Sequence, residues 1–203
     1  MKLFHSPLSP YVRKVVVLLH ELDKTGDVLL ETVTTTAFAS DQSLLAANPL
    51  GKLPALQRDN GVILYDSRVI TAYLDDLYSG GLYPQGMGKW DHLVLEATGD
   101  GIMDSAVSMA YERKLRPANE QSEGWVDAQW AKVDRALNNL NARWMSHLSG
   151  PLSMGQISVA CALSYVDLRH AARNWRQGNE NLAEWHAIFE SRASMQATKP
   201  PAA

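Results

Sequence analysis

The chain has 203 residues, of which 46% are hydrophobic and 20% are charged, and its formal net charge is −3. This balance is typical of an ordinary globular protein, and without a basic excess nucleic acid is not an expected partner. No apolar run reaches the roughly 18 residues of a membrane-spanning helix, and no secretory h-region follows Met1. A single cysteine, Cys161, excludes an internal disulfide and any CxxC redox or zinc site. We therefore expect a cytoplasmic protein.

Residues 1–79 alternate strand and helix signals. Apolar residues recur at helical spacing after Pro10, and β-branched residues dominate a second strand. Asp59-Asn60-Gly61 supplies the Asn-Gly pair that marks a hairpin turn. The expected elements are strands at Lys2–His5 and Val28–Thr34 around a helix at Pro10–Leu22, a hairpin of strands Ala55–Arg58 and Val62–Tyr65, and a helix from Asp66.

Strand signals stop after a Gly/Pro/Ser-rich segment, SGGLYPQGMG, at residues 79–88. Four helical patterns follow, at residues 89–115, 122–148, 151–173 and 181–192. The sequence therefore predicts an α/β domain over residues 1–79, a linker over 80–88 and an all-α domain over 89–203.

Ser9 stands directly before Pro10 at the start of the first predicted helix. Serine followed by proline is a favoured helix start, so capping alone explains both residues. The free N–H groups and partial positive charge of a helix start also favour an anion. A hydroxyl here could donate a hydrogen bond to a thiolate, and the residues alone leave both interpretations open. Ser6 lies one turn earlier and could substitute.

Two further segments combine turn chemistry with the potential to bind a ligand. In NPLGKLPAL (48–56) Pro54 enters a strand, and the base rate of about 5–6% cis for X-Pro bonds favours a trans bond there. In LYDSRVI (64–70) Asp66 or Ser67 caps a helix, which explains both residues. The same helix start could bind a carboxylate, while Asp66 binds an ammonium group. Two such helix starts predict an extended ligand with separated polar ends.

Other candidate groups point to structure rather than chemistry. Ser153 and Gln156 form an S-x-x-Q capping box, and Cys161 lies in an apolar helical stripe typical of a core. The six histidines show no HExxH or other ligand spacing, so we expect no metal.

Together these segments resemble the glutathione transferase superfamily over essentially the whole chain, in the manner of a bacterial branch with an active-site serine. The family has a thioredoxin-like domain followed by an all-helical domain. SPYVRK (9–14) is similar to its active-site turn, NPLGKLPAL to its N-P-x-G-K-V-P-A-L segment, and DSRVITAYL (66–74) to its E-S-x-A-I-x-x-Y-L segment.

The resemblance implies a role for each matching residue. Ser9 would activate the thiol of glutathione, the co-substrate, for attack on an electrophilic or peroxidic small molecule. The bond between Leu53 and Pro54 would be cis, and the Leu53 backbone would meet the cysteinyl part of glutathione. Lys52 would reach a carboxylate of the same ligand, and the residues that would hold its γ-glutamyl end are Asp66 and Ser67.

The resemblance also implies a second-substrate pocket and an assembly. The electrophile would lie between the domains, near Tyr11, Met103, Val107 and Tyr111. The family forms two-fold homodimers, and Gly99 and Gly101 within a long helix could allow close approach of a second subunit. The family's S-x-A-D motif reads Ser153-Met154-Gly155-Gln156 here, so the role of its buried aspartate is missing.

Two rival functions follow from the same residues. If Ser9 is only a helix cap, the chain would be a non-catalytic ligand-binding or protein-interaction module, because a fold does not fix a function. Cysteine-dependent disulfide exchange is disfavoured because the predicted active-site turn contains no cysteine.

Overall fold

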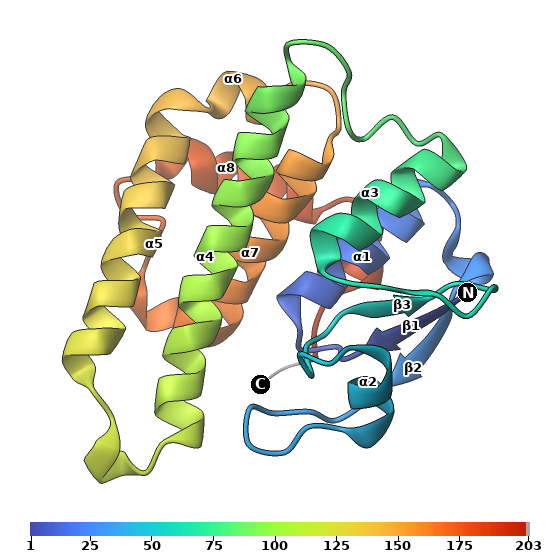
Figure 1. Cartoon of the computed structure of the whole chain (residues 1–203). Helices are drawn as coiled ribbons and strands as arrows, with labels where there is room; N and C mark the ends of the chain where they lie inside the picture. The colour runs from blue at the N-terminus through green and yellow to red at the C-terminus, as the bar shows by residue number, and fades with distance from the viewer. Residues whose placement is uncertain (202–203) are drawn as a thin grey trace. The chain divides into compact units, whose positions relative to one another are not determined.

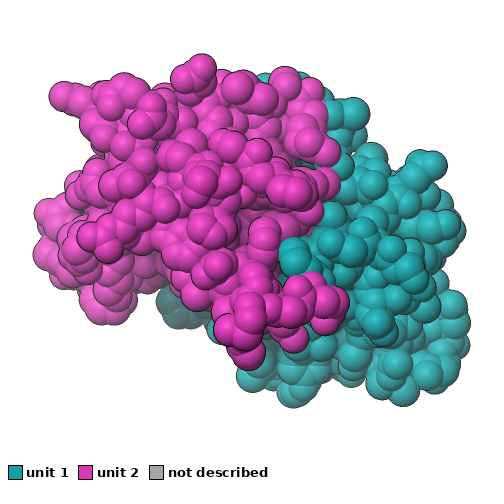
Figure 2. All heavy atoms as spheres, turned by 90° about the horizontal axis from the view of Figure 1, so that it is seen from above, with its two compact units in different colours: residues 1–84, 193–201 teal, residues 85–192, 202–203 magenta. Residues whose placement is uncertain are grey.

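The computed structural model describes residues 1–201, and these form two compact units. The first unit comprises residues 1–84 together with 193–201, and the second comprises residues 85–192 (Figure 2). This division differs from the predicted helical domain of residues 89–203, because the chain returns to the first unit after residue 192.

A four-stranded mixed sheet with the order β2-β1-β3-β4 organises the first unit (Figure 1). Strand β1 is parallel to β2 and antiparallel to β3, which is antiparallel to β4. All strands and helices that the sequence predicts for this unit are present. The structure adds the six-residue helix α2, which the sequence analysis did not predict because a helix of fewer than two turns is too short to show a repeating apolar pattern. The elements are β1 (Lys2–His5), α1 (Pro10–Glu21), β2 (Leu29–Thr32), α2 (Gln42–Ala47), β3 (Ala55–Gln57), β4 (Ile63–Leu64) and α3 (Ser67–Tyr78).

Side chains of the sheet alternate between two covered faces. Leu3 and Leu56 are paired across β1 and β3 and are fully buried on one face. The next pair, Phe4 and Ala55, lies on the other face and packs against Leu44 of α2. Helices α1 and α3 contact each other on the face opposite α2 (Figure 1). The central strands β1 and β3 are therefore covered on both faces, and the predicted site segments emerge from one end of the sheet.

The carboxyl-terminal helix α9 (Ala193–Ala197) packs on α1 within the first unit. The guanidinium of Arg13, which is 6% exposed, donates from Nη2 to the Met195 carbonyl at 3.0 Å. Its Nε donates to the hydroxyl of Thr198 at 3.3 Å. These two bonds attach the carboxyl-terminal segment to α1.

Every regular element of the second unit within residues 85–192 is a helix, and α4 packs against both α5 and α7 (Figure 1). The predicted helix over residues 122–148 is two helices, because Trp144 has φ −113° and ψ 3° and interrupts the helical backbone. The elements are α4 (Lys89–Leu115), α5 (Glu123–Arg143), α6 (Met145–Leu148), α7 (Met154–His170) and α8 (Glu180–Glu190).

Helices α4 and α7 approach closely at two glycines. A Cβ atom on Gly99 would lie 2.7 Å from the backbone of Ser158, and one on Gly155 would lie 2.8 Å from the Leu95 side chain. Gly99 therefore admits α7 of the same chain, which corrects its predicted role in contact between subunits. Gly101 is exposed, with no atom within 4 Å of its Cβ position.

The predicted capping box at the start of α7 is present. The Oε1 atom of Gln156 accepts a hydrogen bond from the Ser153 backbone N–H at 2.6 Å. Its Nε2 atom donates to the carbonyls of Leu148 and Gly150 at 2.9 and 3.0 Å. Glutamine thus supplies the acceptor that an aspartate would supply, and its amide donor also fixes the loop between α6 and α7.

Candidate active site

Three predicted segments emerge at one end of the sheet. Phe4 of β1 pairs with Ala55 of β3, so the segment after β1 lies beside the residues that precede β3. Leu56 pairs with Leu64 of β4 in antiparallel register, so the residues after β4 reach the same end. The turn with Ser9, the loop with Leu53-Pro54 and the start of α3 are therefore neighbours, although they are far apart in sequence.

Ser9 caps α1 and keeps a free donor. Its Oγ accepts a hydrogen bond from the backbone N–H of Val12 at 3.3 Å, and its carbonyl accepts one from Arg13 N–H at 3.0 Å. Within residues 1–201 no acceptor receives the Ser9 hydroxyl proton. The hydroxyl can therefore donate to an anion while the N–H of Val12 polarises it.

Ser6 stays an alternative donor at this turn. Its carbonyl accepts a hydrogen bond from Ser9 N–H at 3.1 Å, and its hydroxyl has no hydrogen-bond partner in the described part of the chain. Ser6 is half-buried but lies outside the helix, so no helix N–H polarises its oxygen.

The loop before β3 is held by Asn48, a residue that the sequence interpretation left out of the site. The Asn48 side chain is 2% exposed, donates to the Lys52 carbonyl at 2.8 Å and accepts from Leu50 N–H at 3.0 Å. Gly51 follows with φ +61°, which favours glycine. The sequence does contain a pattern that could have indicated these two hydrogen bonds, because Asn48 stands two residues before the turn residues Leu50 and Gly51.

The bond between Leu53 and Pro54 is cis, which confirms the expectation from resemblance and overrides the base rate for X-Pro bonds. Neither the N–H nor the carbonyl of Leu53 is bonded to another part of residues 1–201. The exposed Lys52 likewise forms no ion pair with the described residues. The loop therefore offers one backbone donor, one backbone acceptor and a cation to a ligand.

Asp66 and Ser67 share the start of α3 between them. Asp66 is the N-cap, and its Oδ1 accepts from Arg68 N–H at 3.0 Å. Ser67 is 3% exposed, yet its hydroxyl makes no hydrogen bond to any of residues 1–201. Because Asp66 performs the capping, the Ser67 hydroxyl stays available to a ligand.

A chain of hydrogen bonds supports Ser67 from behind. The buried hydroxyl of Thr71 donates to the Ser67 carbonyl at 2.9 Å and lies 2.8 Å from the hydroxyl of Tyr83. Asp75 in turn accepts from the backbone N–H groups of Leu82 and Tyr83 at 2.8 and 3.2 Å. The sequence interpretation missed this support, because Tyr83 lies in the predicted linker and no local pattern marks it.

The four residues predicted near the second substrate lie on α1 and α4. Tyr11 is half-buried on α1, and within the second unit Met103 has no exposed surface. Val107 is half-buried and Tyr111 is 42% exposed on the same helix as Met103. Of the three residues on α4, Tyr111 thus presents the most surface.

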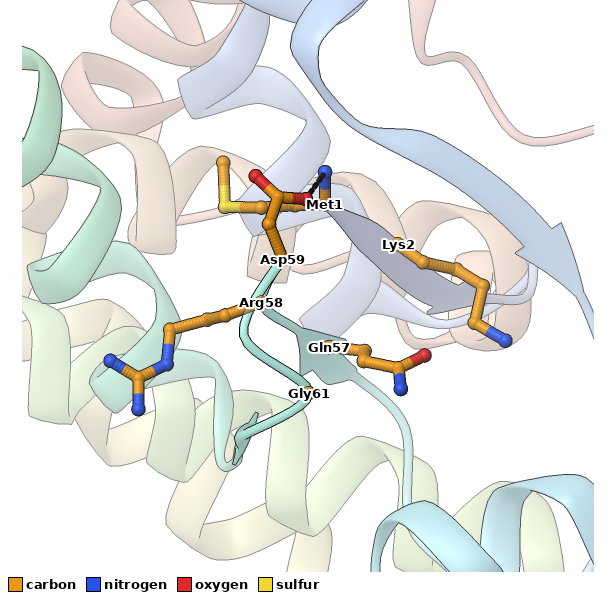
Figure 3. Close-up of a pocket in the computed structure, with 6 residues that line it drawn as sticks. All are labelled: Met1, Lys2, Gln57, Arg58, Asp59 and Gly61. Atoms are coloured by element: carbon orange, nitrogen blue, oxygen red, sulfur yellow. Dashed lines mark ion pairs between the residues drawn. The ribbon is translucent and has the colours of Figure 1, made fainter.

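A shallow pocket of about 310 Å³ lies away from these segments, at the opposite end of β1 and β3 (Figure 3). Its wall includes the amino group of Met1, which pairs with the Asp59 carboxylate at 2.8 Å. The pocket contains none of the predicted site residues, so it is not part of the candidate active site.

Residues 1–201 contain no group of three or more His, Cys, Asp or Glu side chains able to hold a metal ion. The thiol of Cys161 is buried inside α7. In the described part of the chain, no helix combines the length and apolar character required to cross a bilayer.

The family can be assigned from two sequence matches. The model of the glutathione S-transferase N-terminal domain matches residues 3–81, and that of the C-terminal domain matches residues 123–187. This chain belongs to the glutathione transferase superfamily. A GST-like protein of Escherichia coli K12, YibF, is 30% identical over the full length of both chains and is itself uncharacterized.

Solved structures of other members share the fold. A glutathione transferase family member from Pseudomonas fluorescens Pf-5, with bound glutathione, is 47% identical, covers 98% of each chain and has a TM-score of 0.97. A second structure from that organism holds S-(propanoic acid)-glutathione, with 45% identity, coverage of 99% and 100%, and a TM-score of 0.92. A transferase from Methylobacillus flagellatus with bound glutathione is 33% identical, with coverage of 98% and 99% and a TM-score of 0.85.

Proposed function

We propose that this glutathione transferase superfamily member binds glutathione and activates its thiol for transfer to an electrophilic small molecule. The observation that carries the proposal is the Ser9 hydroxyl, which is polarised by the N–H of Val12 and keeps its own proton for a thiolate. The glutathione bound in the Pseudomonas fluorescens and Methylobacillus flagellatus relatives supports the choice of ligand.

The polar groups at this end of the sheet fit the parts of glutathione. The free backbone of Leu53 suits the cysteinyl amide, because it offers one donor and one acceptor. The Ser67 hydroxyl and the N–H groups at the start of α3 suit the γ-glutamyl carboxylate. The Asp66 carboxylate suits the γ-glutamyl ammonium group, and Lys52 suits the remaining carboxylate.

Lowering the thiol pKa is worth a large gain in nucleophile. A free thiol with a pKa of about 8.5 is roughly 3% ionised at pH 7. A pKa lower by about two units would leave about three quarters of it as thiolate, which is a roughly 25-fold gain. One charge-assisted hydrogen bond from Ser9, together with the helix start, is chemically suited to a shift of that size.

The second substrate is an electrophile or a peroxide in this proposal, and an electrophilic carbon has the more direct support. The ligand bound in one relative, S-(propanoic acid)-glutathione, has a carbon substituent on its sulfur, which is what a transfer of the thiolate to carbon would produce. Attack on a peroxide is the second activity to examine.

Titration calorimetry with glutathione, followed by turnover of chloro-aromatic, epoxide and hydroperoxide substrates, tests the proposal. We expect saturable binding of glutathione and catalysis of at least one class. Binding without turnover across the panel would identify a non-catalytic binding module of the same fold. Absence of binding would contradict both functions.

We also propose a homodimer, on the basis of exposed apolar side chains on two helices. Val69 of α3 is 48% exposed, and Trp90 and Val94, one turn apart on α4, are 61% and 47% exposed. Isolated apolar residues are common on surfaces, but pairs at helical spacing are suited to burial against a second copy.

Light scattering at micromolar concentration should give twice the chain mass, and Val94→Glu should shift it toward the monomer. A monomeric wild-type protein would refute the dimer.

A further inference from the structure

The carboxyl-terminal segment (residues 193–198) belongs to the first unit, where it lies against α1 (Figure 2). Near the start of the segment, the hydroxyl of Ser194 donates a hydrogen bond to the carboxylate of Glu21, the last residue of α1. At its end, the hydroxyl of Thr198 accepts a hydrogen bond from Arg13, one turn after Ser9. The segment therefore runs antiparallel to α1, and the two α1 residues that it bonds are eight residues, or about 12 Å, apart along that helix.

The contact nearer to Ser9 is buried. Arg13 is 6% exposed, and the side chain of Met195 has no exposed surface. The Arg13 guanidinium donates to the Met195 carbonyl at 3.0 Å and to the Thr198 hydroxyl at 3.3 Å. A buried charge requires such partners, and the planar donors of arginine hold them in one geometry. Since a helix of five residues is not stable by itself in water, α9 and the start of α1 are ordered together.

The same arginine is bonded to Ser9 through its backbone. The N–H of Arg13 donates to the Ser9 carbonyl at 3.0 Å, which is the first hydrogen bond of the α1 ladder. The N–H of Val12 donates to the Ser9 hydroxyl oxygen at 3.3 Å. A shift of this turn would move both N–H groups and would therefore turn the Ser9 hydroxyl. Arg13 thus connects a segment that is distant in sequence to the group that faces the thiolate in the proposed function.

We propose that the carboxyl-terminal segment positions the Ser9 hydroxyl, with Arg13 as the positioning residue between them. This inference rests on the proposed function, because its effect is on the thiolate that Ser9 would stabilise. The segment holds the first turn of α1 where the Ser9 proton meets the glutathione sulfur, and release of the segment leaves glutathione bound but less ionised. A misplacement of about 1 Å can cost on the order of 100-fold in rate, so a small shift of this turn is measurable.

A buried and an exposed position on α9 provide a matched pair of variants. Met195→Lys places an ammonium group at a fully buried site and should displace the segment from α1, whereas Ala197→Lys places the same charge at an exposed site of the same helix. Met195→Lys should lower kcat at pH 7 by up to about 25-fold, the full gain that a two-unit fall in thiol pKa provides. Ala197→Lys should leave kcat unchanged. Because both variants keep Arg13 and add one positive charge, their difference reports position rather than charge.

The pH dependence separates positioning from a general loss of stability. Displacement of the segment should raise the pKa of the bound thiol, so the acidic limb moves to higher pH. Above that pKa the kcat of the variant should approach the wild-type value, because the thiolate then forms without help. A protein that is merely less stable would lose activity at every pH, and its limb would not move. The ultraviolet absorption of the thiolate in the complex with glutathione gives the same pKa without a second substrate.

Thr198→Val is a milder variant that keeps the test valid if Met195→Lys does not fold. It preserves the shape of the side chain and removes the hydroxyl that accepts from Arg13. The acidic limb should move in the same direction as in Met195→Lys, by a smaller amount. In a Ser9→Ala background Thr198→Val should not move the limb further, because the hydroxyl that the segment positions is gone.

Ser194→Ala is the control at the distant end of α1, since it removes only the side-chain hydrogen bond to Glu21 and should leave the limb in place. An equal movement of the limb in Ser194→Ala and Thr198→Val would show a general loosening of α1 and count against Arg13 as the connection. An unmoved limb in both Met195→Lys and Thr198→Val, in a protein whose wild type binds glutathione, would overturn this inference alone. Absence of glutathione binding by the wild type would overturn the proposed function as well.

Discussion

The first backbone N–H groups of α1 and α3 both need a side-chain acceptor, and the two helix starts supply it in different ways. At α1 one side chain, Ser9, both caps the helix through Val12 N–H and offers its proton outward. At α3 the work is divided, since Asp66 caps the helix and Ser67 stays unpartnered. One residue therefore supplies both the cap and an available hydroxyl at α1, whereas two residues supply them separately at α3.

This difference determines what a mutation can report. A change at Ser9 removes the helix cap and, in the proposed function, the donor to the thiolate, so its effect on catalysis must be separated from its effect on stability. A change at Ser67 removes a group that has no partner among residues 1–201, so any effect on glutathione is an effect on binding. The comparison is tested by variants that act on only one helix start.

Ser67→Ala should have the largest effect. The loss of a hydrogen bond to a charged group costs about 1.5–3 kcal/mol, or roughly 10- to 150-fold in affinity. Because the hydroxyl should act equally on ground and transition states, the KM for glutathione rises by that factor while kcat stays nearly constant. Steady-state kinetics measure the split, and thermal unfolding should be almost unchanged. Ser146→Ala, on the exposed surface of α6, is the control, and an unaltered KM would remove Ser67 from the site.

Ser9→Ala should reduce kcat by up to about 25-fold at pH 7, the full gain that a two-unit fall in thiol pKa provides. The pKa of bound glutathione should rise, so the acidic limb of the pH–rate profile moves to higher pH. Loss of the cap should also cost about 1 kcal/mol of unfolding free energy, which Ser67→Ala does not. Ser6→Ala is the matched control at the same turn. If Ser9→Ala leaves the limb and kcat unaltered, Ser9 is only a cap and Ser6 becomes the candidate donor.

The fold of the first unit and the positions of its helix starts could be predicted from sequence because each depends on a local pattern. Ser9-Pro10 and Asp66-Ser67 mark helix starts in any chain, and β-branched residues mark strands. The cis bond before Pro54 was different, since local propensity favours trans and only the resemblance to the family indicated cis.

The support behind those residues could not be predicted, because it is made of contacts between distant positions. Asn48, Thr71 and Tyr83 are ordinary turn, helix and linker residues until the fold brings their partners within hydrogen-bond distance. For the same reason, Gly99 suggested contact between subunits until the packing of α4 on α7 supplied its true neighbour, Ser158.

Tyr83→Phe should have the smallest effect on glutathione affinity, and it tests the hydrogen bonds behind the start of α3. The Thr71 hydroxyl lies within hydrogen-bond distance of the Ser67 and Arg68 carbonyls and 2.8 Å from the Tyr83 hydroxyl, so removal of the Tyr83 hydroxyl takes one contact from the group that bonds Ser67. A hydrogen bond of this kind is worth about 0.5–1.5 kcal/mol, so glutathione affinity should fall by roughly 2- to 12-fold without a change in the acidic limb. Tyr78→Phe is the control, because the Tyr78 hydroxyl bonds Asp27 instead.

A double-mutant cycle decides whether Tyr83 acts through Ser67 or through the general stability of the first unit. If it positions Ser67, Tyr83→Phe should have no further effect on glutathione affinity in a Ser67→Ala background, because the group it positions is gone. If the two losses add, the hydrogen-bond chain contributes to the site independently of the Ser67 hydroxyl. Capping, support and ligand binding would then not be separate roles of separate residues at the start of α3, and this helix start would resemble that of α1, where one residue has two roles.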